Sequence, residues 1–79
     1  MRILYIAASG RSDPTRASIP WHLAVNGSVE VGQETGIVLA GESVELMLPE
    51  VLAGLEGVGL PPARDLVAKA RQHDVPVYV

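Results

Sequence analysis

Apolar residues gather in three short runs along this chain, separated by longer segments in which they recur at helical spacing. The runs at residues 2–8, 35–40 and 75–79 are almost continuously apolar. Such runs are typical of strands that are covered on both faces, as in a parallel sheet. Segments 14–31 and 62–73 carry apolar residues at i, i+3 and i+4 spacing, which predicts two amphipathic helices.

Local signals mark the boundaries of these elements. Asp13 followed by Pro14 predicts a helix start, because Asp accepts from first-turn N–H groups and Pro at the first helical position loses no intrahelical bond. Pro20 removes one backbone hydrogen bond and predicts a bend in the first helix. Gly32 suits the left-handed position that ends a helix, and Gly36 in the second strand predicts a bulge or a close backbone approach.

The stretch between the second strand and the last helix is the least regular. Residues 44–48 predict a short helix that Pro49 ends, and residues 50–60 predict a buried, irregular connection because glycines interrupt their apolar positions. In the last helix, Asp65 and Lys69 have the i,i+4 spacing that favours an ion pair.

The order of these elements, β-α-β-α-α-β, predicts an α/β fold. Right-handed crossovers then give a parallel sheet with helices on its faces, a three-layer arrangement that is part of a doubly wound fold. We expect residues 1–79 to form a single, incomplete domain from which the C-terminal strands of the fold are missing. Three strands leave two open edges, so another segment or subunit should cover at least one of them.

Composition and charge exclude several classes of protein. A net charge of −3 and a pI near 5.1 argue against nonspecific nucleic-acid binding and against a polybasic membrane patch. No apolar run approaches the ~20 residues that cross a bilayer, so we expect a cytoplasmic protein. The chain has no cysteine, and His22 and His73 lack metal-ligand spacing, so we expect neither a metal nor another cofactor.

Candidate chemistry follows from the predicted sheet, because ligands of an open parallel sheet bind beyond the carboxyl ends of its strands. The loop after the first strand is the segment richest in polar groups, and the turn after the second strand is the other candidate. Gly10 would let the backbone approach a ligand, and the following helix start could hold a small anion or nucleotide-like group. The candidate ligand-binding residues are Ser9, Gly10, Asp13, Thr15, Arg16 and Gly41.

These candidates also have a structural interpretation. Ser9 and Asp13 are residues that any capped strand-to-helix turn contains, and the loop matches neither GxGxxG nor GxxxxGK[ST]. Arg11 and Arg16 are either solvated charges or partners of Asp13. The sequence leaves both interpretations of the loop open.

No catalytic constellation stands out. Nothing in the sequence places a base beside Ser9, so that residue is a poor nucleophile. His22 is best explained as a packing or interface residue and His73 as a cation at a helix end, while Glu42 and Glu45 have a spacing that is common on solvated faces.

Taken together, several short segments resemble the DsrE/DsrF-like family, and the likeness covers essentially all 79 residues in one order. The segments are residues 8–10 (ASG), 13–18 (DPTRAS), 20–24 (PWHLA), 39–41 (LAG), 57–62 (GVGLPP) and 75–79 (VPVYV). The resemblance implies a small α/β subunit that forms homo- or hetero-oligomers, often trimers or hexamers. It also implies sulfur-relay partners, to which such subunits pass sulfane sulfur as a cysteine persulfide.

The chain departs from that family at its last strand, which in similar members is followed at once by a Cys. Here the sequence ends at Val79, immediately before that position. Persulfide chemistry cannot be carried over to any residue present, because Ser and His do not replace a sulfur carrier. One hypothesis is that the next codon is a UGA for selenocysteine read as a stop, which predicts an open reading frame downstream. A mutated Cys codon or an arbitrary fragment boundary would give the same sequence.

Three functional interpretations therefore remain. The first is a DsrE-like subunit of a sulfur-relay assembly, without its reactive Cys or selenocysteine. The second is a noncatalytic binding or scaffold subunit that holds a small anion at the loop after the first strand. The third is an inert truncated product whose apolar last strand makes it aggregate.

Overall fold

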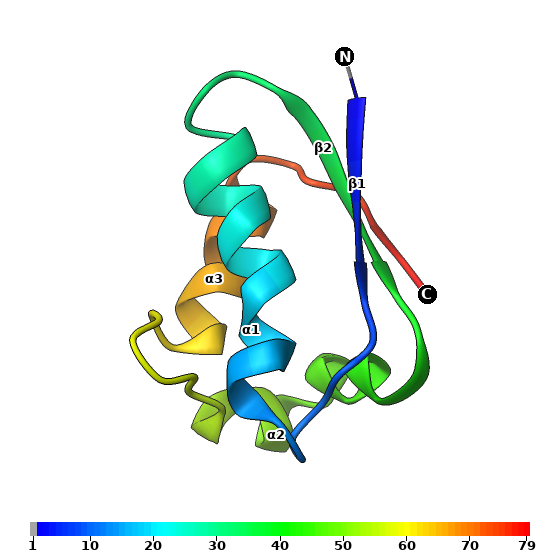
Figure 1. Ribbon diagram of the computed structural model, residues 1–79, viewed down its shortest axis with the longest axis vertical. Helices are drawn as coiled ribbons and strands as arrows, with labels where there is room; N and C mark the ends of the chain where they lie inside the picture. Colours follow the sequence, from blue (N-terminus) through cyan, green and yellow to red (C-terminus); the bar gives the residue numbers. More distant parts are fainter. Residues whose placement is uncertain (1) are drawn as a thin grey trace.

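A computed structural model describes residues 2–79 of the chain. Strands and helices alternate along it, as Figure 1 shows. The elements are β1 (Arg2–Ala7), α1 (Pro14–Leu23), the π-helical segment η1 (Ala24–Ser28), β2 (Glu34–Leu39), the 3₁₀ helix η2 (Gly41–Met47), α2 (Pro49–Gly54), α3 (Ala63–Gln72) and β3 (Val77–Tyr78).

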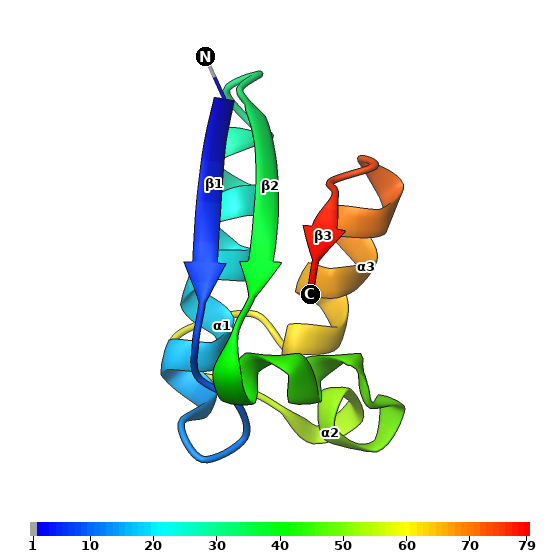
Figure 2. The same cartoon turned by 90° about the vertical axis from the view of Figure 1, so that its right-hand side faces the viewer.

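The strands form one parallel sheet in the order β1-β2-β3, which confirms the α/β class and the common strand direction (Figure 2). Ile6 is paired with Val38, and Val38 with Tyr78. The third strand is shorter than the predicted run of residues 75–79. Pro76 has no N–H to donate, although its carbonyl oxygen accepts from Ile37 N at 2.9 Å.

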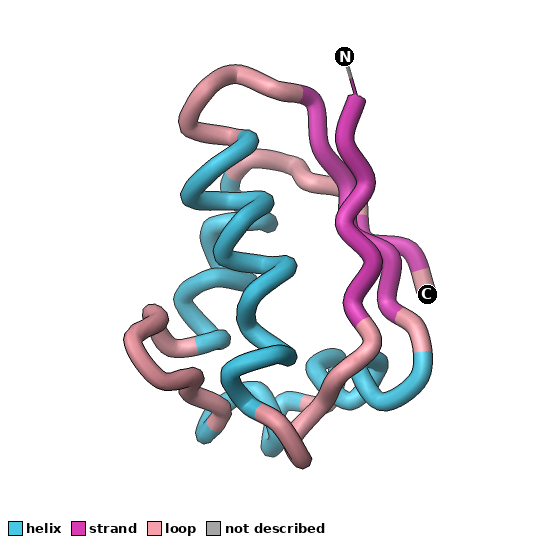
Figure 3. The backbone as a smooth tube through the Cα atoms, viewed as in Figure 1, coloured by secondary structure: helices cyan, strands magenta, loops and turns pink. Residues whose placement is uncertain are grey.

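Helices α1 and α3 pack together on one face of the sheet (Figures 1 and 3). The described residues therefore form two layers, and the third layer expected from the sequence is not among them. The reason lies in the strand order. The chain steps from β1 to β2 to β3 in one direction, so crossovers of the same hand place both helices on the same face.

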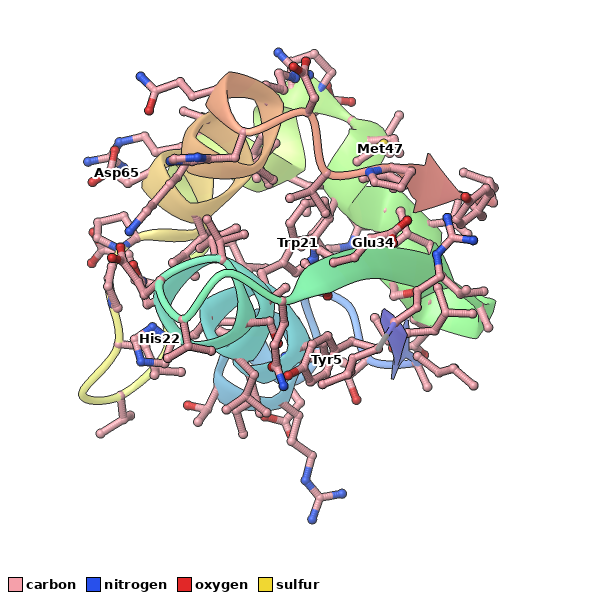
Figure 4. All side chains as sticks on the ribbon, turned by 90° about the horizontal axis from the view of Figure 1, so that it is seen from above. Tyr5, Trp21, His22, Glu34, Met47 and Asp65 are labelled. Carbon is pink, nitrogen blue, oxygen red and sulfur yellow. The ribbon has the colours of Figure 1, made fainter. Side chains whose placement is uncertain are left out.

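Between the two layers lies a core of aliphatic side chains around the single tryptophan of the chain. Trp21 projects from α1 into this interior, as the view from above shows (Figure 4). The largest fully buried apolar side chains are Trp21, Ile37, Leu46, Leu66 and Val25.

The first helical segment differs in detail from the helix predicted over residues 14–31. The α-helix ends at Leu23, and the chain continues through the π-helical segment, in which Val29 N donates to Ala24 O at 2.9 Å. Gly32 then adopts φ = 76°, which confirms its predicted left-handed position.

The segment after β2 is more helical than predicted. Residues 41–47 form a 3₁₀ helix that begins before the short helix predicted over residues 44–48. Pro49 both ends that helix and opens α2 at its first turn, so the irregular connection predicted from residue 50 is wrong over residues 50–54. Proline favours this first helical position because it has no N–H to leave unpaired there.

A network of polar side chains links α3 to the segment that runs from α1 through η1. Lys69 Nζ on α3 donates to Asn26 Oδ1 at 2.7 Å and pairs with the carboxylate of Glu30. Asn26 in turn lies 3.1 Å from His22 Nδ1 through its side-chain nitrogen. The predicted pairing of Lys69 with Asp65 along α3 is therefore wrong, because the carboxylate of Glu30, in the turn after η1, takes its place.

Candidate functional site

The candidate loop lies where the sequence predicted it, beyond the carboxyl ends of β1 and β2. In Figure 2 both strands point toward the end of the molecule that holds α2 and η2. Ser43 joins the two strand ends, because its buried hydroxyl lies 2.9 Å from Ala7 O and 2.7 Å from Ala40 O. The sequence placed Ser43 in the second candidate turn, residues 41–43, but gave no sign of this role, which depends on the parallel arrangement of the strands.

Asp13 and Arg16 form a hydrogen bond and an ion pair with each other at the start of α1. Asp13 Oδ1 accepts from Arg16 N at 3.1 Å, and the Arg16 Nε atom lies 3.6 Å from Asp13 Oδ2. The first turn is thus capped by a carboxylate of its own chain. An incoming anion would meet this negative charge at the position where helix N–H groups were expected to receive it.

Thr15 holds a distant loop. Its Oγ1 atom accepts from Val58 N at 3.0 Å, and the Gly57 backbone lies so close that a Cβ there would be 2.9 Å from Thr15 Cα. Thr15 therefore fastens residues 57–58 against the start of α1.

Gly10 brings two loops together. A Cβ at this position would overlap with the backbone carbonyl of Glu42 and the carboxylate of Glu45, so the Gly10 backbone lies against η2 at the place where a ligand was predicted to approach it. Gly41 has φ = 56° and faces Ala8 O, while Ser9 beside it is half-buried. The six candidates are gathered around the carboxyl ends of β1 and β2, and their role as ligand-binding residues stays a prediction.

Carboxylates from η2 balance the cations of this loop. Arg11 Nε lies 2.9 Å from Glu45 Oε2, and Arg11 N donates to Glu45 Oε1 at 3.2 Å. Ser12 Oγ donates to Glu42 Oε2 at 2.6 Å. The sequence suggested that Glu42 and Glu45 lie on a solvated face. Instead, they join the loop after β1 to η2. Since about thirty positions separate them from the loop, the only sequence signal was the parallel topology that brings strand ends together.

The polar groups at the strand ends thus bind one another. Residues 2–79 contain no group of three or more acidic or histidine side chains that could hold a metal ion. The arrangement fixes the loops that surround the strand ends and supports the structural interpretation of the capped turn.

The face of the sheet that α1 and α3 do not cover is the second candidate site, and we call it the open face. Leu4, Ile6 and Tyr78 project from it with 53%, 71% and 45% of their surface exposed. No helix lies over these strands in the view of Figure 2, which looks onto this face. The apolar content of β1 predicted burial on both sides, and the described residues bury only one.

Gly36 and a charged pair complete the open face. A Cβ at Gly36 would lie 3.0 Å from Leu4 Cδ2 and 3.4 Å from Tyr78 Cε2, so this glycine leaves room for two large neighbours. The predicted close approach is confirmed, whereas the regular register shows no bulge. At the amino end of the face, Arg2 Nε lies 3.6 Å from Glu34 Oε1.

Comparisons of the chain with protein-family models, with curated proteins and with solved structures find no match. The resemblance to DsrE/DsrF-like proteins therefore rests on the short segments of the sequence. Among the helices of residues 2–79, none combines the length and the apolar character that a membrane crossing needs.

Proposed function

We propose that this chain is a noncatalytic α/β subunit that associates with a second copy of itself through the open face. The observation that carries the proposal is the row of exposed Leu4, Ile6 and Tyr78 on a parallel sheet. Strands of this composition are normally covered on both faces, and a contiguous exposed apolar surface is typical of an interaction site.

The charges on the open face favour a second copy as the occupant. Arg2 and Glu34 are register partners, as are Leu4 with Gly36 and Ile6 with Val38. A twofold axis parallel to the strands and between β1 and β2 places each residue of one copy opposite the register partner in the other. Arg2 then faces a glutamate and Ile6 faces a valine, so the surface is complementary to itself.

The resemblance to DsrE/DsrF-like proteins suggests a sulfur-relay assembly as the setting. A twofold contact of this kind fits a hexamer, which is one of the assemblies that the resemblance implies. Because the chain has no cysteine, it carries no persulfide itself. Residues 1–79 would then contribute structure to such an assembly and no sulfur carrier.

Sedimentation equilibrium of matched variants tests this proposal. The wild-type chain should sediment at a multiple of its 8.3 kDa mass, and Ile6→Lys should sediment as the monomer, because an ammonium group cannot be buried between two apolar sheets. The control is Val58→Lys, which alters another exposed apolar residue (86% exposed) in the 57–60 loop, away from the sheet. A monomeric wild-type chain, or equal masses for the two variants, would contradict the proposal.

A further inference from the structure

We propose that the free edge of β3, together with a small apolar pocket beside it, binds an extended aliphatic segment of another polypeptide as an added strand. This edge lies on the side of the sheet where α3 is found, away from β1 and the candidate loop (Figure 2). Two features of the edge, one of the backbone and one of the side chains, carry the proposal.

The first feature is the backbone of Val77. Its register partner in β2 is Ile37, and Ile37 N donates to Pro76 O at 2.9 Å. Because backbone groups alternate in direction along a strand of a parallel ladder, Val77 directs its own N–H and C=O away from β2. Residues 2–79 place no further strand at that edge, so one donor and one acceptor are aligned for an added strand.

The second feature is an apolar pocket of about 120 Å³ on the helix side of the sheet, beside Val77. This volume is below the ~300–1,000 Å³ of sites that hold drug-sized ligands, and it suits a single aliphatic side chain. No acidic side chain lines the pocket. Its aliphatic walls come from α3, η2 and the β3 segment: Val67, Ala70, Met47, Val75 and Val77.

The two features fit one mode of binding. Residues that stand opposite each other on neighbouring strands point to the same face of a sheet, so a residue opposite Val77 directs its side chain to the helix side, where the pocket lies. In strand addition the main-chain bonds supply affinity, and a pocket for alternate side chains supplies specificity. We therefore expect an aliphatic side chain opposite Val77 to select the partner.

Charge favours a separate segment over a second copy of the chain at this edge. Helix α3 carries three basic residues against one acidic residue: Arg64, Lys69, Arg71 and Asp65. A twofold axis at the edge of β3 would bring two copies of this helix together, and like charges disfavour such a contact. A segment with acidic residues at the ends of its aliphatic part is attracted to the same charges.

Peptide titration followed by tryptophan fluorescence tests the proposal, because Trp21 is the only tryptophan and lines the pocket. The probe is acetyl-ETITVTE-amide. The control peptide, acetyl-ETNTNTE-amide, keeps the length and charge without the aliphatic side chains. We expect a saturable change of emission with the first peptide and none with the second. Emission that does not saturate, or equal responses to the two peptides, would overturn the proposal.

Matched variants of the chain separate the pocket from the backbone edge. Met47→Asp places a carboxylate in the pocket wall and should weaken binding of the aliphatic peptide by about tenfold or more. Val44→Asp adds the same charge to η2 at a residue of similar exposure (37%, against 40% for Met47) that does not line the pocket, and should bind like wild type. Equal affinities of the two variants would exclude the pocket.

Val77→Pro tests the backbone edge. Proline removes the outward N–H of this residue and leaves the bond from Ile37 N to Pro76 O in place, so the sheet should persist while peptide binding is lost. Circular dichroism checks that the variant is folded. Undiminished peptide binding by the folded variant would show that no strand is added at this edge.

A second copy at the edge would give a different outcome. Met47→Asp, but not Val44→Asp, would then lower the sedimenting mass of the chain, and the peptide would leave Trp21 emission unchanged. That result would overturn the proposal. It would not decide association through the open face, which Ile6→Lys tests separately.

Discussion

At Gly10 the backbone lies against η2 so closely that no side chain fits, whereas Gly27 within η1 has open space on every side of its missing Cβ. The sequence places Gly10 in a loop and Gly27 inside the helix predicted over residues 14–31, and both glycines precede polar positions. It does not show the tertiary contact between the first loop and residues 42–45. Gly10 is required by packing, and Gly27 is a site where glycine lowers helix stability.

Matched alanine substitutions should therefore act in opposite directions. Gly10→Ala forces a methyl group into the Glu42 carbonyl and should lower the free energy of unfolding by about 1–3 kcal/mol. Gly27→Ala should raise it by about 0.5–1 kcal/mol, because the unfolded chain loses conformational freedom. Urea unfolding at one fixed protein concentration measures both. A neutral Gly10→Ala would show that the two loops are not in contact.

At the scale of elements, the segment from α1 through η1 is joined to α3 by Lys69 and its partners. The hydrogen bond from Lys69 and the attraction of its charge hold the pKa of Glu30 below its ordinary value of 4.5. Burial of the carboxyl opposes this shift, and the charge of His73 adds to it. The turn after η1 is thus tied to α3 by an ion pair that depends on the ionised form of Glu30.

Acid titration should reveal this link. Because the folded pKa of Glu30 is lowered, the unfolded chain binds more protons between the two pKa values, so stability rises with pH there. The contribution is complete above pH 4.5 and is lost as the pH falls through the lowered folded pKa. Unfolding measured from pH 7 to pH 3 should show a shallower acid loss for Glu30→Gln than for wild type.

The control for this titration is Glu56→Gln, which removes an exposed carboxylate that has no ion pair within residues 2–79. It should follow the wild-type acid limb. Identical slopes for Glu30→Gln and wild type would contradict a role of the Lys69 pair in acid stability.

The elements themselves were largely predictable, because their signals are local. Asp13 and Pro14 start α1 where the sequence placed it, and β1 follows its apolar run to within one residue. Helix α2 was missed because Pro49 was interpreted only as a stop, although proline also opens helices. The position of the candidate loop followed from topology, but its bonds to Glu42 and Glu45 depend on a tertiary contact that no local pattern encodes.

At the scale of the whole molecule, the order β1-β2-β3 decides what remains exposed. Both long helices cover one face, and the other face keeps the apolar residues that suggested a strand buried on two sides. The sequence pattern therefore indicated that this face requires a cover. It could not indicate that both helices of residues 2–79 would lie on the same side. That depends on the order of the strands in the sheet, and hydrophobic periodicity carries no information on strand order.

The most direct test of the proposed self-association is a contact observed across copies. In a mixture of ¹³C-methyl-labelled and unlabelled chains, isotope-filtered NOE spectra report only pairs of protons on different molecules. We predict intermolecular NOEs between the methyl groups of Ile6 and Val38, which the twofold arrangement places opposite each other. Spectra without intermolecular NOEs, or with NOEs only from helix residues such as Leu23, would contradict docking through the open face.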